Sequence, residues 1–161
     1  MSAVKRLFLN IVVCIGIVCN FFGVFSQAWI TDYGGSIGIV PFYSTEVGWY
    51  ALASWMMYIS VACHLLVTIL LTLVFRDVRR NGYCHYQRSQ FFLIAFFSLM
   101  VTILTVTAVI LIGVNLPNLN YNYNDNATLG YSAWVSVAAA VCYFIAAGLA
   151  LSFAFLECRC C

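Results

Sequence analysis

The sequence predicts an all-α membrane protein: a bundle of four transmembrane helices with a small extracellular β-sheet from its two outer loops. Of the 161 residues, 65% are apolar or aromatic and 7% are Asp, Glu, Lys or Arg, whereas a soluble domain carries about 25% charge. Four apolar runs separate along the chain, each near the roughly 20 residues that a spanning helix needs. The net charge of +2 is too small to favour nucleic acid as a partner. We therefore expect a single tetraspan domain over residues 1–161, with the lipid bilayer as its surroundings.

The first predicted span is Leu7–Phe25, which follows Lys5 and Arg6. Basic residues before an apolar run are also typical of a secretory signal peptide, but the apolar region of such a peptide is usually about 7 to 15 residues long. We therefore expect the first segment to be retained as a helix. The other three predicted spans are about Trp49–Phe75, Phe91–Val114 and Tyr131–Leu156.

The charged residues divide between the two sides of such a bundle. The two chain ends and the loop 76–90 hold all seven basic residues, whereas the loops 26–48 and 115–130 hold no Lys or Arg and three of the five acids. Basic residues accumulate on the cytoplasmic side of membrane proteins. We therefore predict a multi-pass plasma-membrane protein with both termini in the cytoplasm and two loops outside.

The outer loops carry strand signals. In the first loop, two β-prone runs flank a Gly-Gly pair at residues 34–35, which is typical of a hairpin. In the second, apolar residues from Leu119 to Tyr123 alternate with asparagine, as in a half-buried strand. We expect these segments to form one sheet. The residues that we expect to make contacts from these loops are Trp29, Asp32, Tyr33, Phe42, Tyr43, Glu46, Tyr121, Tyr123 and Asp125.

Two kinds of covalent modification are predicted. Asn126 begins an Asn-Ala-Thr tripeptide, the acceptor of N-glycosylation, and lies on the predicted outer side. Neither outer loop contains cysteine, so no disulfide can join them. Cysteines beside a span on the cytoplasmic side suit S-palmitoylation, with metal binding and prenylation as competing interpretations for the tail. The candidates for palmitoylation are Cys84, Cys158, Cys160 and Cys161.

No set of residues suggests catalysis. Within the four spans, His64 is the only titratable side chain besides Tyr and Cys, and no carboxylate or second His lies at its depth. A nucleophile, a base and an orienting group do not assemble, so we predict no enzyme, catalytic residue, metal or cofactor. Small and polar residues mark faces where helices pack within the bundle or, alternatively, side by side between copies. These helix-packing residues are Gly16, Asn20, Gly23, His64, Ser136 and Ala140.

Two short motifs carry a family resemblance. The first outer loop begins with Ser-Gln-Ala-Trp-Ile at residues 26–30, and the fourth span begins with Leu-Gly-Tyr-Ser-Ala-Trp at residues 129–134. With four spans in about 160 residues, the chain resembles the superfamily of claudins, the peripheral myelin protein and the epithelial membrane proteins. The resemblance implies a left-handed four-helix bundle under an extracellular sheet. The family's loop motif is Trp, then Gly-Leu-Trp, then two cysteines; Trp29 matches its first residue, Gly38-Ile39-Val40 takes the next place, and the cysteine pair is absent.

From this resemblance we predict a structural protein of cell–cell junctions, acting in adhesion or as a paracellular barrier. Its partners are then further copies of itself or other junction proteins. Two alternatives stay open: an accessory subunit of an ion channel or receptor, and a MARVEL-type membrane-trafficking or septate-junction protein. If the protein formed a pore, the three outer acids would favour cations.

Overall fold

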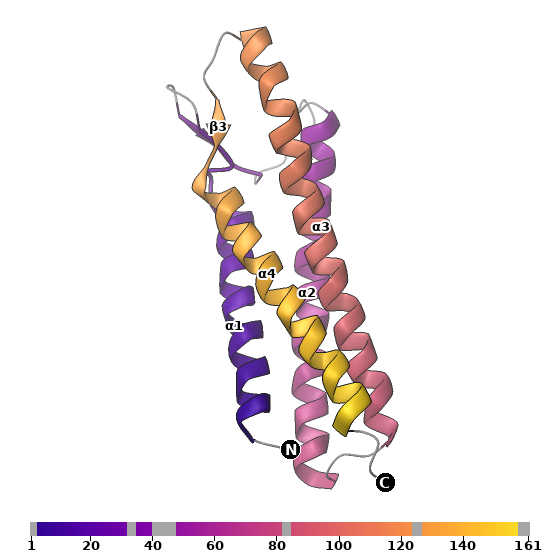
Figure 1. Ribbon diagram of the computed structural model, residues 1–161. Coiled ribbons are helices and arrows are strands. Elements are labelled where there is room, and N and C mark those ends of the chain that lie inside the picture. The colour runs from indigo at the N-terminus through magenta and orange to yellow at the C-terminus, as the bar shows by residue number, and fades with distance from the viewer. Residues whose placement is uncertain (1–2, 32–34, 40–47, 82–84, 124–126, 158–161) are drawn as a thin grey trace.

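The protein is a bundle of four long helices with a small sheet at one end (Figure 1). The computed structural model describes residues 3–31, 35–39, 48–81, 85–123 and 127–157. The helices are α1 (Ala3–Phe25), α2 (Gly48–Asn81), α3 (His85–Tyr123) and α4 (Tyr131–Ser152), and α4 continues into a short π-helix, η1 (Phe153–Glu157). All four long helices are apolar enough to cross a bilayer, which confirms the predicted four-helix membrane fold. The start of α1 and the end of α4 lie at the same end of the bundle, away from the sheet.

The sheet contains three strands of two residues each, and its central strand belongs to the first connecting segment. The strands are β1 (Ile30–Thr31), β2 (Ser36–Ile37) and β3 (Thr128–Leu129). Both β2 and β3 pair antiparallel with β1, so that Ile30 lies opposite Ile37 on one side and opposite Leu129 on the other. The predicted hairpin is therefore confirmed, and so is a sheet with strands from both segments that we predicted as outer loops.

The predicted strand from Leu119 to Tyr123 is wrong, because this segment is the last part of α3. Once a helix has formed, each further residue adds a hydrogen bond at low entropic cost, and this outweighs the weak alternation of apolar and polar residues. At 39 residues and 1.5 Å per residue, α3 is about 58 Å long. Figure 1 shows its end rising past the sheet. The second loop instead contributes its strand at Thr128, immediately before α4.

The bundle has two cores, one at each end. Helix α4 packs along both α1 and α3, and α3 packs along α2, whereas α1 touches α2 at few places. The core away from the sheet is apolar, and its largest buried side chains include Leu9, Phe91 and Phe153. The core near the sheet is centred on Trp29 and includes Tyr50. The sheet therefore rests on its own hydrophobic cluster.

The contact between α1 and α4 depends on the absence of a side chain at Gly23. A Cβ atom built there would overlap the Ser136 hydroxyl and lie 3.3 Å from the Ser136 backbone nitrogen. About two turns earlier in α1, a Cβ on Gly16 would lie 2.9 Å from the ring of Tyr143. Close approach through small residues is a common way for membrane helices to pack. The predicted packing residues Gly16, Gly23 and Ser136 thus lie at this interface, where Ala140 is also buried.

Substitution of Gly23 by alanine should destabilise the protein by about 1–3 kcal/mol, because the new methyl group forces α1 and α4 apart. Gly148 is the matched control, since a Cβ there has nothing within 4 Å, and an alanine in a helix is favoured over glycine by about 0.5–1 kcal/mol. Thermal unfolding of the purified variants in detergent measures both effects. Equal melting temperatures for G23A and G148A would contradict the assignment.

Candidate functional site

Trp29 joins the sheet to the bundle. Its side chain is fully buried, and its indole Nε1–H donates a 2.6 Å hydrogen bond to the Gly23 carbonyl in the last turn of α1. Its backbone N–H donates to the Ile37 carbonyl at 2.9 Å, and its carbonyl accepts from the Gly130 N–H at 2.9 Å. We predicted Trp29 as a loop contact, and this is wrong, because a fully buried side chain cannot reach a partner. Its role in the fold is to fasten the sheet.

Helix α2 holds the segment that follows β2. The Tyr50 hydroxyl donates to the Gly38 carbonyl at 2.8 Å, and the Tyr58 hydroxyl donates to the Ile39 carbonyl at 3.5 Å. Between them, the Ile39 side chain is fully buried in the core near the sheet. The end of the hairpin is therefore fixed by side chains of α2, whereas Trp29 bonds to the backbone of α1.

A third tie joins the segment that precedes β1 to the first turn of α4, which follows β3. The hydroxyls of Ser26 and Ser132 lie 2.6 Å apart, and the Ser132 N–H donates to the Ala28 carbonyl at 3.1 Å. Gly130 allows this approach, because a Cβ there would overlap the Ala28 carbonyl. The ties from α1, α2 and α4 together hold the sheet at a fixed place without a disulfide.

Most of the predicted contact and modification residues lie outside the described part of the chain. Tyr121 and Tyr123 belong to α3, although nothing is described of their side chains. On the described part of the sheet, Ser36 and Ile37 are exposed. The predicted residues outside the described part are Asp32, Tyr33, Phe42, Tyr43, Glu46, Cys84, Asp125, Asn126, Cys158, Cys160 and Cys161.

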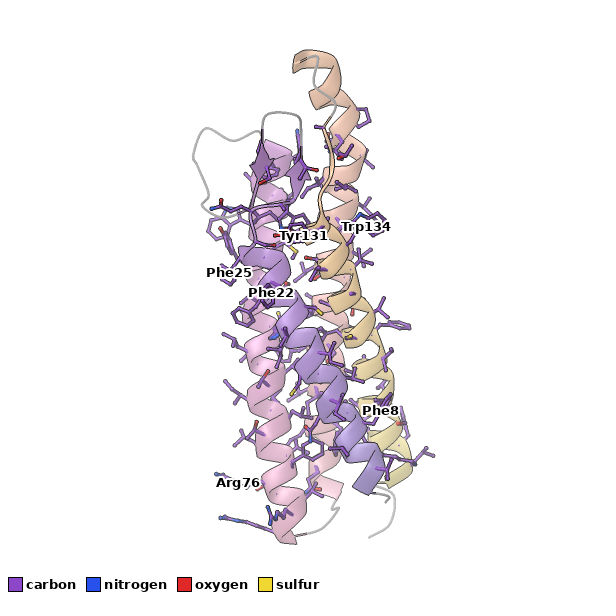
Figure 2. The ribbon with its side chains drawn as sticks, turned by 90° about the vertical axis from the view of Figure 1, so that its left-hand side faces the viewer. Phe8, Phe22, Phe25, Arg76, Tyr131 and Trp134 are labelled. Carbon is purple, nitrogen blue, oxygen red and sulfur yellow. The ribbon has the colours of Figure 1, made fainter. Side chains whose placement is uncertain are left out.

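A belt of exposed aromatic side chains lies just below the sheet. Phe22 and Phe25 project from the end of α1, and Tyr131 and Trp134 project from the start of α4 (Figure 2). Each is 54–67% exposed. Tyrosine and tryptophan rings are enriched where a membrane meets water, so Tyr131 and Trp134 indicate the level at which the bundle leaves the hydrocarbon.

A polar pair lies in the middle of the bundle. The Tyr143 hydroxyl lies 2.7 Å from His64 Nδ1, and both side chains are almost completely buried. The ring of Phe21 meets the His64 ring edge-on at 5.8 Å. One turn nearer the sheet, Asn20 donates a long hydrogen bond of 3.4 Å to Ser60. The polar members of the predicted packing faces thus point inward.

The tyrosine hydroxyls were not predicted as partners in these contacts. A buried tyrosine hydroxyl usually needs a hydrogen-bond partner, and Tyr50, Tyr58 and Tyr143 lie in apolar segments where this need is a usable signal. Among the described residues, no group of three or more His, Cys, Asp or Glu side chains could hold a metal ion. The described polar contacts join one helix to another, as at His64 and Tyr143, or join the sheet to the helices, as at Trp29 and Tyr50.

A family model described as tight junction protein, claudin-like, matches residues 1–161. The chain belongs to this claudin-like family. The predicted resemblance to the claudin superfamily is thus confirmed, and the protein is a tetraspan membrane protein of the junction type whose family is structural rather than enzymatic. No curated protein matches the chain. This claudin-like protein keeps the first tryptophan of the family's loop motif in a buried position and lacks the cysteine pair.

Replacement of Trp29 by phenylalanine should loosen the sheet while the helices remain, because it removes the hydrogen bond to Gly23. Loss of a buried hydrogen-bond partner costs about 1–3 kcal/mol, so hydrogen exchange of amides in residues 28–39 should accelerate by roughly tenfold or more. Trp134→Phe is the control, since Trp134 is 65% exposed. Unchanged exchange rates in W29F would show that the indole N–H is not needed.

The hydrogen bond between His64 and Tyr143 should appear as coupling in a double-mutant cycle. For His64→Leu and Tyr143→Phe we expect a coupling energy of about 0.6 kcal/mol, and up to about 1.7, as for other hydrogen bonds between membrane helices. Equilibrium unfolding in mixed detergent micelles gives the four free energies. A control cycle pairs Tyr143→Phe with Thr72→Val, whose hydroxyl bonds within its own helix, and should be additive. Additive effects in both cycles would refute the coupling.

Proposed function

We propose that this claudin-like protein forms cell–cell contacts, in adhesion or as part of a paracellular barrier. The membership of residues 1–161 in a tight junction family carries the proposal. The ties at Trp29 and Tyr50 support it, because a sheet fixed to the membrane helices presents its loops at a constant height and direction. We also propose that the protein has no catalytic activity, in keeping with its family.

We propose that the sheet lies outside the cell and that both termini are cytoplasmic. All seven basic residues belong to the chain ends and to the segment 76–90, which suits the cytoplasmic side. The aromatic belt below the sheet supports an interface at that level. This orientation places Asn126 where it can be glycosylated, and it places the cysteines of the tail and Cys84 where they can be palmitoylated.

The contacts across the intercellular gap are proposed to come from the loop tips. Their aromatic members are Tyr33, Phe42 and Tyr43, together with Tyr121 and Tyr123 at the end of α3, and the acids Asp32, Glu46 and Asp125 would set any preference for cations. Trp29 is excluded from this group because it is buried.

Lateral assembly in the membrane is proposed to use the lipid-facing side chains. The small residues Gly16, Gly23 and Ser136 are already occupied by the packing of α1 against α4, so they have no surface to offer another copy. Other junction proteins or further copies of this chain are the proposed partners.

The test is clustering of non-adherent cells that express the tagged full chain. We expect cells to aggregate, with the protein enriched at contacts, and the triple variant Phe42→Ala, Tyr43→Ala, Tyr121→Ala to reduce aggregation to the level of untransfected cells. Tags at either terminus should be reached by antibody only after permeabilisation.

Phe22→Ala is the control variant, since Phe22 lies on α1 outside the loop tips and is one of many exposed apolar side chains of the bundle, so its loss alone should leave clustering unchanged. Surface delivery of every variant is measured in parallel. Uniform surface distribution without clustering, together with co-purification of a channel, would contradict the proposal and favour an accessory subunit. Unchanged clustering by the triple variant would refute the role of the loop tips.

A further inference from the structure

Arg88 is held against two aromatic rings at the end of the bundle away from the sheet. Its guanidinium carbon lies 5.7 Å from the ring centroid of Phe92, one turn along α3, and 5.5 Å from that of Phe155 in η1. The two rings meet edge-to-face, with centroids 5.3 Å apart and planes at 87°. We call Arg88, Phe92 and Phe155 the arginine seat.

The arginine seat lies on the outside of the bundle. Phe92 is 36% exposed and Phe155 is 50% exposed, although both belong to helices that the bilayer surrounds. Exposed apolar side chains neighbour them in sequence, including Leu93 and Leu156. A lipid molecule is therefore the natural neighbour of this surface.

The seat is preformed by a second pair of rings. Phe153 in η1 is buried against Phe91 in α3, with ring centroids 5.3 Å apart. This inner pair fastens η1 to α3 and so fixes the place of Phe155, two residues further on. Short π-helical segments frequently occur at functional sites, and here the segment holds one wall of the seat.

The guanidinium needs acceptors that the described residues do not supply in full. Its Nε–H is buried and has no hydrogen-bond partner among them, so an oxygen acceptor from outside has to bind the terminal N–H groups of the guanidinium. The ring faces attract a cation, but they do not replace oxygen acceptors for the five N–H donors of an arginine. A cation at the border of the hydrocarbon is unfavourable without an anion. Phosphate oxygens match the planar fork of a guanidinium.

We propose that the arginine seat binds the headgroup phosphate of an anionic phospholipid. The lipid's acyl chains then cover Phe155 and its apolar neighbours, which a soluble phosphate cannot do. A net negative headgroup is favoured because the same end of the bundle carries exposed Lys5, Arg76, Arg79 and Arg80. Juxtamembrane basic residues attract the anionic lipids of the cytoplasmic leaflet. This site does not depend on the proposed junction function.

The full-length protein in detergent is titrated with phosphatidylserine or with phosphatidylcholine, and bound lipid is measured by native mass spectrometry. We expect phosphatidylserine to bind more tightly, and Arg88→Gln to weaken its binding by at least about tenfold, the loss expected for one charged hydrogen-bonding group. The affinity of Arg88→Lys for phosphatidylserine should lie between those of the wild type and Arg88→Gln, because lysine keeps the charge but lacks the planar fork of the guanidinium. Phe155→Leu should weaken binding with the charge intact.

Arg79→Gln is the matched control, since it removes the same charge from an exposed helix end and should change binding much less, above all at high salt. Melting temperatures show that each variant is folded, and R88K and F155L carry the test if R88Q does not fold. Equal weakening by R79Q and R88Q would overturn the proposal in favour of diffuse attraction. Equal binding of phosphatidylcholine, or displacement of the lipid by inorganic phosphate alone, would also overturn it.

Discussion

The buried indole of Trp29 fixes the relation between the sheet and the membrane helices. A sheet of three two-residue strands is too small to be stable by itself, so its order has to come from the surface beneath it. Trp29 supplies that surface: its ring fills the core near the sheet, and its N–H reaches back to the Gly23 carbonyl. Gly23 is also the residue that lets α1 approach Ser136 of α4. One turn of α1 therefore supports both the packing of two helices and the attachment of the sheet.

The buried polar residues are concentrated in the half of the bundle that faces the sheet. The pair His64 and Tyr143 lies near the middle, and Asn20 with Ser60 and then Ser26 with Ser132 follow toward the sheet. The other half is closed by apolar side chains around Phe91 and Phe153. In lipid, apolar side chains alone do little to determine which helix faces meet, because lipid tails are as apolar as the helices. The polar contacts hence determine which helix faces meet in the half near the sheet. In the other half, the helices are held by tight packing of rings and methyl groups.

The sequence predicted the features that depend on composition and local pattern. The length of the apolar runs was enough to predict the four helices, and the Gly-Gly pair between β-prone runs was enough to predict the hairpin. The strand expected at Leu119 to Tyr123 failed because helix continuation from a long apolar segment overrides a short alternation. The burial of Trp29 could not be predicted, since an aromatic residue at this position suits the membrane interface equally well. Its burial is decided by the Gly23 carbonyl at the end of α1, which only the three-dimensional turn of the chain brings within reach.

The absence of a loop disulfide changes how the two parts of the protein depend on each other. A crosslink would hold the strands together even if the helices shifted. Here the sheet is held through Trp29 by the Gly23 carbonyl of α1, by Tyr50 and Tyr58 of α2 and by Ser132 of α4, so three helices contribute to its attachment. A change in the packing of any of these helices moves a tie and therefore moves the loops that the sheet carries. The loops and the membrane helices must consequently respond together to lipid or to a neighbouring protein.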